Sequence, residues 1–341
     1  MTIKKSSPAA GRSGSAVNLR SPAVRALIAL VFVLALGALF NAEGAFFKWD
    51  THRDMLRHIS VFGILACGLT LVIIAAGIDL SVGSVLGFTA VLFSLVSLRF
   101  GWPAWLAVVA CLAAGAACGL VSGGLIARFR VQPFIATLAM MVFARGLAKS
   151  ISGGQKISTA ILRPDGTYQY ADVPGVFAFL NSKVLGQNIA VVTLLFFLCV
   201  LVCWVILARL RWGRYIYAVG GNEEAARLSG VPVAATKLLA YGLSGFFCAV
   251  AGLCQAAQEL QGDPETGTGY ELTAIAIVVI GGADLQGGRG GLGLTLIGAM
   301  TIGYLEKILS INAVGESGRL MLTGIIIVGA VLFQKCRKSP G

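Results

Sequence analysis

The sequence predicts an all-α protein that crosses a membrane about ten times. Of its 341 residues, 57% are hydrophobic and only 12% are charged, whereas a soluble domain carries about 25% charged residues. Apolar runs such as 24–40, 59–76, 104–127 and 190–208 reach the length of about 17–25 residues that crosses a bilayer core. The polar stretches between these runs are too short to bury a core of their own, which excludes a separate soluble domain.

The elements follow from these runs in chain order. We expect crossings at residues 24–40, 59–77, 80–98, 104–127, 134–149, 188–208, 238–257, 272–282, 290–309 and 320–333. Residues 1–22 are rich in Ser, Gly, Lys and Arg, and we expect a disordered basic tail there. Residues 23–335 then form one transmembrane domain, and residues 336–341 form a second tail. The first span resembles a signal peptide, but the spans that follow favour a retained anchor.

The net charge is +12, and its distribution predicts an orientation. Sixteen of the 27 Lys and Arg residues lie in the two tails, in the stretches 128–130 and 209–237, or at Arg25, Arg289 and Lys335. By the positive-inside rule these segments face the cytoplasm, so both termini are expected inside after an even number of crossings. The basic residues thus indicate membrane topology, and they form no stripe that would bind nucleic acid.

Two segments share a pattern in which an apolar run breaks at glycine and presents one carboxylate. They are 74–83, with Asp79, and 279–288, with Asp284. A lone charge at the centre of a bilayer costs about 2.5–3.5 kcal/mol even on lenient scales. We therefore expect each carboxylate either to cap the helix that follows it or to line a translocation path where interrupted helices gather. The match also leaves an internal duplication open.

Gly115, Gly119 and Gly123 lie one helical turn apart on one face of a predicted span. Such a seam lets the backbone of a second helix approach closely, which is how helices pack in lipid. Static packing is the main interpretation, and a helix that slides along a pathway is the alternative.

The sequence holds no pattern of a catalytic, cofactor or metal site. It contains no Walker A loop, no H-E-x-x-H and no G-x-S-x-G motif. The G-x-G-x-x-G match at 288–293 lacks the soluble βαβ unit that a dinucleotide site requires. Most of the eight cysteines lie in apolar runs, where we expect small helix residues. His52 and His58 have no second ligand at metal spacing, so we expect interfacial anchors there and no enzyme activity.

The main polar segment, 209–237, is basic and helix-forming. Within it Glu224 opens a short helical stretch, and Gly230 follows as a residue that ends a helix in the left-handed conformation. Two more polar gaps face the opposite side: 151–186, rich in turn-forming pairs, and 258–271, which holds four acidic residues and no basic one. We expect these outer gaps either to dock a soluble partner or to act as solvated connectors.

Four stretches together carry a family resemblance: GLTLVIIAAGIDLSVGSVLGF from Gly68, QPFIATLAMMVFARGLA from Gln132, RWGRYIYAVGGNEEAARLSGV from Arg211 and GYELTAIAIVVIGGADLQGGRGGLGLTLIGA from Gly269. They resemble the inner-membrane permease subunits of bacterial ABC importers for simple sugars, the ribose, xylose and galactose transporter family. The similarity covers roughly residues 55–335, in the same order.

The resemblance implies one half of a homodimeric or heterodimeric pore in the bacterial inner membrane. A soluble binding protein delivers a monosaccharide outside, and ATP-binding subunits attach inside. In that family the loop at 209–237 resembles the coupling helix that fits a groove on the ATPase, and this role falls here on Asn222, Glu223, Glu224, Ala225, Ala226 and Gly230. The chain departs from the family pattern in two places. Pro232 comes only two residues after Gly230, and a long outer insertion lies around 163–170.

Because sugars are neutral, the path is expected to show hydroxyl, amide and aromatic groups and not charge pairs, with no cofactor. We expect it near Ser81, Ser84, Thr137 and Asn188, with Asp79 and Asp284 in the path or at helix breaks. Two alternatives stay open. A branched-chain amino-acid ABC permease would need opened helix ends or paired charges for its zwitterionic substrate. A self-sufficient secondary transporter would need membrane carboxylates that carry ions.

Overall fold

The computed structural model of the chain describes residues 21–162, 167–170, 172–315, 317–319, 321–322 and 324–325. Its helices are α1 (Pro22–Leu39), α2 (Trp49–Ile74), α3 (Val82–Ser94), α4 (Ala104–Arg128), α5 (Pro133–Ser152), α6 (Gly175–Asn181), α7 (Val191–Arg209), α8 (Arg211–Gly221), α9 (Glu223–Leu228), α10 (Val233–Glu259), α11 (Tyr270–Ile280) and α12 (Leu292–Ile311). Two short turns of other helix types, η1 (Ala45–Phe47) and η2 (Leu95–Arg99), precede α2 and follow α3. The described strands form three antiparallel pairs: β1 (Ile157–Ser158) with β6 (Gln261–Gly262), β2 (Ala160–Leu162) with β3 (Tyr168–Tyr170), and β4 (Lys183–Val184) with β5 (Ile189–Ala190).

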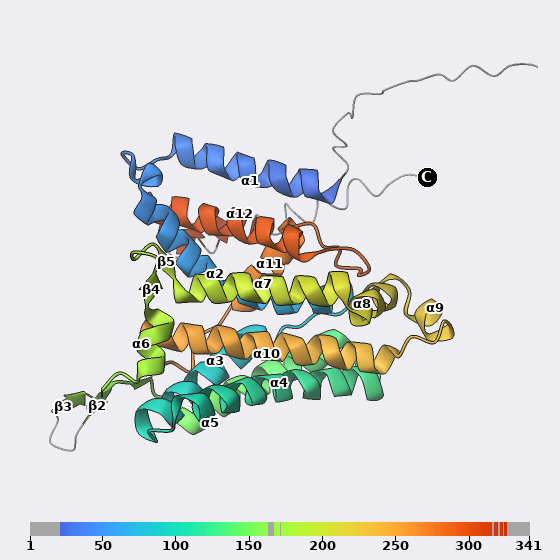
Figure 1. The fold of residues 1–341 in the computed structure, drawn as a ribbon, viewed down its shortest axis with the longest axis horizontal. Coiled ribbons are helices and arrows are strands. Elements are labelled where there is room, and N and C mark those ends of the chain that lie inside the picture. Colours follow the sequence, from blue (N-terminus) through green and yellow to red (C-terminus); the bar gives the residue numbers. More distant parts are fainter. Residues whose placement is uncertain are drawn as a thin grey trace, which may run out of the picture.

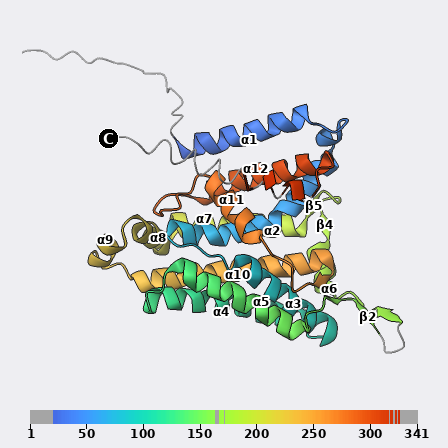
Figure 2. The same ribbon diagram turned by 180° about the vertical axis from the view of Figure 1, so that it is seen from behind.

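The long helices lie side by side in a stack, with α1 along one edge and α4 and α5 along the other (Figure 1). The short helices α8 and α9 lie at one end of the stack, which we call the α9 end. Helix α6 and the small strand pairs lie at the opposite end, which we call the α6 end. The view from behind shows α3, α5 and α11 on the near face (Figure 2). This layering gives the molecule two polar ends joined by apolar helices.

Eight described helices are long and apolar enough to cross a membrane: α1, α2, α3 extended by η2, α4, α5, α7, α10 and α12. This finding confirms the prediction of a polytopic helical protein, whereas the number of crossings stays a prediction. The predicted span 272–282 corresponds to α11, which has only 11 residues and at about 1.5 Å per residue is shorter than a bilayer core. The predicted span 320–333 and the tails 1–22 and 336–341 lie wholly or mostly outside the described residues.

Two predicted boundaries need correction. Helix α2 begins at Trp49 and not at Ile59, because its first turns carry polar residues that an apolar run does not reveal. The segment 209–237 is not one loop with one short helix: it contains α8, α9 and the first turn of α10. In both places helical structure continues past the apolar run, so hydropathy marks the membrane depth of a helix better than its ends.

Two sets of helices follow the same plan in opposite directions. Helix α2 runs toward the α9 end, α3 returns and α4 follows back, whereas α10 runs toward the α6 end, α11 returns and α12 follows (Figure 1). Their lengths are 26, 13 and 25 residues in the first set, and 27, 11 and 20 in the second. The matching motifs do not mark this repeat, because 74–83 lies between α2 and α3 and 279–288 lies between α11 and α12.

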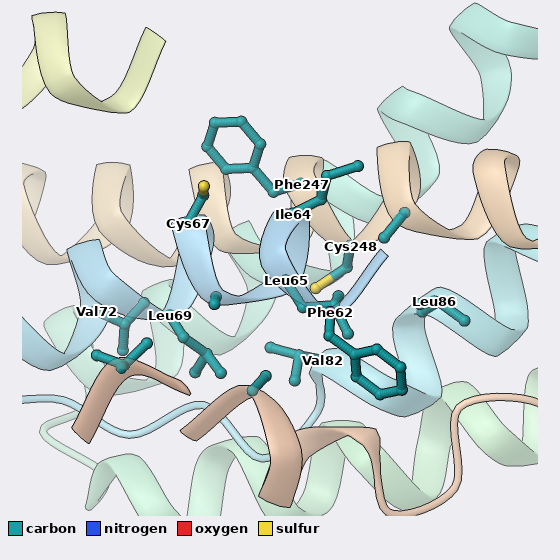
Figure 3. Close-up of a cluster of buried hydrophobic side chains, with 14 of the residues drawn as sticks. Phe62, Ile64, Leu65, Cys67, Leu69, Val72, Val82, Leu86, Phe247 and Cys248 are labelled. Atoms are coloured by element: carbon teal, nitrogen blue, oxygen red, sulfur yellow. The ribbon is translucent and has the colours of Figure 1, made fainter. Parts of the chain in front are cut away.

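Helix α2 forms the centre of the core. Every residue from Ile59 to Ile74 is buried, as expected for a helix that is apolar on all sides and surrounded by other helices. Figure 3 shows side chains of this cluster on three helices: Phe62, Ile64, Leu65, Cys67, Leu69 and Val72 on α2, Val82 and Leu86 on α3, and Phe247 and Cys248 on α10. The seven cysteines in the described part of the chain are buried and free, which agrees with their expected role as small helix residues.

The glycine seam of α4 packs against α10. A Cβ atom on Gly119 would lie 2.1 Å from the carbonyl oxygen of Tyr241, and one on Gly115 would lie 2.6 Å from the carbonyl oxygen of Gly245. A Cβ on Gly245 would in turn lie 2.1 Å from the carbonyl oxygen of Gly115. The two backbones therefore touch directly, which favours static packing over a sliding helix.

Candidate functional site

The break between α2 and α3 carries a buried carboxylate. Asp79 is only 2% exposed. Its Oδ1 accepts hydrogen bonds from the backbone N–H of Ser81 at 3.0 Å and from the Ser81 hydroxyl at 2.6 Å. Its Oδ2 accepts a hydrogen bond from the hydroxyl of Ser244, on α10, at 2.7 Å. The carboxylate thus closes the turn into α3 and fastens that turn to the middle of α10.

The carbonyl group next to Asp79 is also held by side chains. The oxygen of Ile78 accepts hydrogen bonds from the Tyr241 hydroxyl of α10 at 3.3 Å and from the Thr137 hydroxyl of α5 at 3.4 Å. A Cβ atom on Gly77 would lie 2.4 Å from the Tyr241 hydroxyl oxygen, so glycine is needed for this approach. An unpaired backbone carbonyl inside a membrane costs several kcal/mol, and these hydroxyls compensate for the missing helical bonds at the break.

The first turn of α3 meets the segment that precedes α11. A Cβ atom on Gly83 would lie 2.1 Å from the carbonyl oxygen of Gly267 and 2.6 Å from Oε2 of Glu271, so the Glu271 carboxylate borders the start of α3. Arg145 of α5 donates to the carbonyl oxygens of Pro264 and, at 2.7 Å, of Thr266. The two short helices therefore begin side by side, and an arginine inside the bundle fixes the loop between α10 and α11.

The structure brings four of the six predicted path or break residues together. Asp79, Ser81 and Thr137 surround the break, and Ser84 is buried in the first turn of α3. The other two lie elsewhere. Asn188 lies at the α6 end, where its Oδ1 accepts from Trp49 Nε1 at 3.3 Å and from Arg53 at 2.9 Å. Asp284 lies in the turn between α11 and α12, where its Oδ1 accepts from the N–H of Gln286 at 3.1 Å.

Sequence reasoning missed two residues of the break, Tyr241 and Ser244, and the contacts of Arg145 with the loop before α11. Each is a polar or charged residue inside a predicted apolar span, which is itself a signal, because such residues in membrane helices face partners inside the bundle. Their partners are distant in the sequence, so the sequence alone did not say which break they serve.

Helix α9 forms a small exposed surface at the α9 end. The Asn222 side chain caps the helix by accepting from the N–H of Ala225 at 2.9 Å. Glu223 pairs with Arg227 at 3.0 Å and with Lys237 at 2.7 Å, and Glu224 pairs with Arg227 at 3.2 Å. Gly230 follows with a φ of +80°, as the sequence predicted. The capped, ion-paired helix therefore has a defined shape although it has only six residues.

Helix α9 is attached to the bundle through an apolar contact. Ala226 packs in a small buried cluster with Val219 of α8 and Val233 of α10. Leu228, at the end of α9, points the other way and is 80% exposed. This exposed apolar side chain is accessible to a second protein.

Helix α8 connects this surface to the end of α2. A Cβ atom on Gly220 would lie 1.7 Å from the carbonyl oxygen of Ile74, the last residue of α2. The same carbonyl accepts a hydrogen bond from the N–H of Gly288 at 2.8 Å. The Tyr217 hydroxyl donates to the carbonyl oxygen of Gly290 at 2.9 Å. A continuous set of contacts thus runs from α9 through α8 to Ile74 and the break at Asp79.

The acidic gap at 258–271 is paired with bases from α5 and the segment after it. Lys149 contacts Glu265 at 2.6 Å, and Lys156 contacts Asp263 at 3.0 Å. Partial burial would raise the pKa of Asp263, but hydrogen bonds from the N–H of Glu265 and from Lys156 outweigh it and hold the pKa below its ordinary value. The bond to Asp263 raises the pKa of Lys156. Two of the four carboxylates in this gap are therefore paired with lysines of the same chain, which favours the connector interpretation.

No group of three or more His, Cys, Asp or Glu side chains that would hold a metal ion occurs in the described ranges.

Known proteins match this chain along most of its length. Residues 52–331 match the family described as branched-chain amino acid transport system / permease component. The chain is 40% identical to the ribose import permease protein of Escherichia coli (strain K12), over 90% of this chain and 92% of that protein. It is 34% identical to the fructose import permease protein of Rhizobium meliloti, over 92% and 86%. It is 29% identical to the xylose transport system permease protein of Escherichia coli (strain K12), over 96% and 95%. No solved structure gives a significant match.

Proposed function

Because this chain belongs to the family of branched-chain amino acid transport permease components and is similar along most of its length to sugar import permeases, we propose that it is the membrane-spanning subunit of an ATP-driven monosaccharide importer. The full-length similarity to sugar permeases carries this proposal and favours a sugar over an amino acid. The polar groups at the α2–α3 break agree with a neutral cargo, because hydroxyls from the turn before α3, from α5 and from α10 outnumber charges there.

A self-sufficient secondary transporter is the less favoured function. Its coupling carboxylate would need an open position for a proton or an ion. Asp79 already accepts three hydrogen bonds from serine donors and is 2% exposed. These contacts support a role for Asp79 in holding the break together.

The proposed partners are an ATP-binding subunit, an external sugar-binding protein and a second permease subunit, which is either another copy of this chain or a related one. The ATP-binding subunit binds at α9, through the exposed Glu224 and Leu228 and the capped turn around Asn222. The α9 end then faces the cytoplasm, and both chain termini lie on the cytoplasmic side of the bacterial inner membrane, as the basic residues predict.

The proposed mechanism follows the contacts from α9 inward. When the ATP-binding subunits close, they displace α9, and the apolar contact of Ala226 passes that displacement to α8 and α10. The contact of Gly220 with Ile74 passes it to the end of α2. The break at Asp79 then lets α3 change its angle to α2, which opens the path to one side at a time.

Reconstitution in liposomes tests this function. The chain alone should move no sugar, whereas the chain with its ATP-binding subunit, binding protein and ATP should accumulate ribose, fructose or xylose. Replacing Glu224→Lys together with Gly230→Pro should leave insertion intact and reduce uptake by at least about 100-fold, because the ATPase contact is lost. Asp50→Lys, a charge reversal at the opposite end of the bundle, is the matched control for a general charge effect. ATP-independent uptake by the purified chain, or full uptake by the double variant, would contradict the proposal.

A further inference from the structure

A small polar cavity lies between α2 and α12, away from the break described above. Its volume is about 220 Å³, and its polar lining consists of Asp54, His58, Glu306, Lys307, Ser310 and Arg319. Asp54 and His58 lie in the first half of α2 and Glu306 in the second half of α12, so the cavity belongs to the α6 half of the bundle. Apart from Arg319, all of these residues lie on two helices that pack against each other.

Two charge pairs beside this cavity lie close together without a hydrogen bond between their members. His58 Nδ1 lies 3.6 Å from Glu306 Oε2, and Lys307 Nζ lies 3.7 Å from Asp54 Oδ2. Both distances exceed the usual hydrogen-bond range of about 2.7–3.2 Å. The Glu306 and Lys307 side chains are only 20% and 22% exposed, so water meets their hydrogen-bonding needs poorly. These groups therefore keep donor and acceptor capacity directed at a shared space.

The composition of the lining selects the chemistry of the ligand. Two carboxylates, two cationic side chains and one imidazole line the cavity, so net charge favours neither an anion nor a cation. Paired charges would also suit a zwitterion, which the leucine control below tests. The lining supplies both donors and acceptors, and a sugar hydroxyl both donates and accepts. The cavity is smaller than the pockets of about 300–1,000 Å³ that hold drug-sized ligands. These features fit one small, neutral, polyhydroxylated ring.

The cavity also adjoins the start of α11. The His58 ring lies 5.5 Å from the Phe62 ring, and the Phe62 ring lies 4.5 Å from the ring of Tyr270, the first residue of α11. The segment before Tyr270 is the one that meets the first turn of α3. Aromatic rings thus connect the cavity to the place where the two short helices begin.

We propose that this cavity is an entry subsite, on the outer half of the permease, that holds a monosaccharide before it reaches the α2–α3 break. The proposal rests on the function proposed above. Each sugar hydroxyl replaces one of the long contacts, so that Glu306 and Asp54 accept while Lys307 and His58 donate. Binding is weak, because a site on a transport path must release its cargo.

Protection of an introduced cysteine tests the subsite directly. Ser310→Cys is made in a Cys336→Ser background, since the other seven cysteines are buried, and the full importer is reconstituted in liposomes. The rate of labelling by methyl methanethiosulfonate is measured with ribose, fructose or xylose, and with leucine or sodium chloride at equal osmolarity. At least one sugar should slow labelling several-fold, and leucine and salt should not. Glu306→Gln and Lys307→Gln should each abolish this protection, whereas Asp50→Asn, a loss of charge outside the cavity on the neighbouring helix α2, should retain it.

ATP-driven uptake, measured with Ser310 intact, separates the two proposals. Glu306→Gln should lower uptake at sub-saturating sugar by at least about 10-fold, with Asp50→Asn unchanged. If no sugar protects the cysteine, or if leucine protects it equally, the subsite proposal is overturned whether or not the importer moves sugar. Wild-type uptake by a correctly inserted Glu306→Gln variant would overturn it as well. Protection by sugar in an importer that accumulates none would instead refute the proposed function and leave the subsite standing.

Discussion

Asp79 and Asp284 occur in nearly the same sequence pattern and make the same local turn. In each, the carboxylate oxygen accepts from the backbone N–H two residues later, at 3.0 and 3.1 Å. Their surroundings differ. Asp79 is buried and accepts a further bond from Ser244 on a distant helix, whereas Asp284 is only partly buried, and its own N–H donates to the carbonyl oxygen of Arg289 within the same turn.

The difference teaches that an Asp motif specifies a turn but not its role. At Asp284 the turn connects two helices near a polar end, and the carboxylate accepts from the N–H of Gln286 within that turn. At Asp79 the turn interrupts the membrane core, so its carboxylate and carbonyl must find partners on α5 and α10. Interrupted backbone inside a membrane is tolerated where protein groups satisfy it. The role of each motif is therefore set by the depth at which it lies.

The largest effect is expected where the two regions touch. Gly220 lies against the Ile74 carbonyl, next to one motif, and against Gly288, next to the other. Gly220→Val should destabilise the fold by about 3 kcal/mol or more, because the added side chain separates three backbones. Gly221→Ala is the matched control, since a Cβ atom there meets nothing within 4 Å. The yield of folded protein in mild detergent measures the effect, and equal yields for both variants would mean that this junction is not close-packed.

Removing the carboxylates one at a time should have an intermediate effect on the stability of the fold. Asp79→Ala leaves the donors of Ser81 and Ser244 without their acceptor and should cost about 2–3 kcal/mol, whereas Asp284→Ala should cost less than about 1 kcal/mol, because water reaches that turn. Thermal unfolding of the two variants in detergent measures the difference. Similar losses for both would remove the distinction drawn from depth. If Asp79→Asn assembles normally and only transport falls, the path interpretation of Asp79 gains over the cap interpretation.

The smallest loss of stability is expected when only the hydrogen bond from Ser244 of α10 to Asp79 is removed. Ser244→Ala leaves Asp79 with both bonds from Ser81 and should cost about 1 kcal/mol. Combined with Asp79→Ala, it should add almost nothing, because the two groups form one interaction. A double-mutant cycle by thermal unfolding measures this coupling. Additive losses would show that Ser244 and Asp79 act independently.

The sequence predicted the helical membrane fold, the break at Asp79 and the short helix ended by Gly230, because each depends on local signals: apolar length, a glycine–aspartate break and a glycine at a helix end. It did not predict that α10–α12 repeat the plan of α2–α4 in the opposite direction. A short sequence motif does not show in which direction the helices around it cross the bundle. The partners Tyr241 and Ser244 were missed for a related reason: both belong to α10, far from Asp79 in the chain.

The site residues divide in the same way. Ser81 and Thr137 meet at the break, as their hydroxyl chemistry suggested. Asn188 lies instead with Trp49 and Arg53 at the α6 end, because its amide follows a turn and not a membrane helix. The coupling role of α9 stays a prediction, for which the structure supplies a defined shape and an exposed leucine.

The side-by-side start of α3 and α11 has an electrical consequence. Each helix start carries a partial positive charge of about half an elementary charge. The Glu271 carboxylate belongs to the first turn of α11 and borders the first turn of α3, so it offsets both. On the proposed path, the two helix starts would therefore offer an anion no attraction to replace its lost hydration, while an uncharged solute would lose little. We therefore expect the proposed importer to pass a neutral sugar without an accompanying ion.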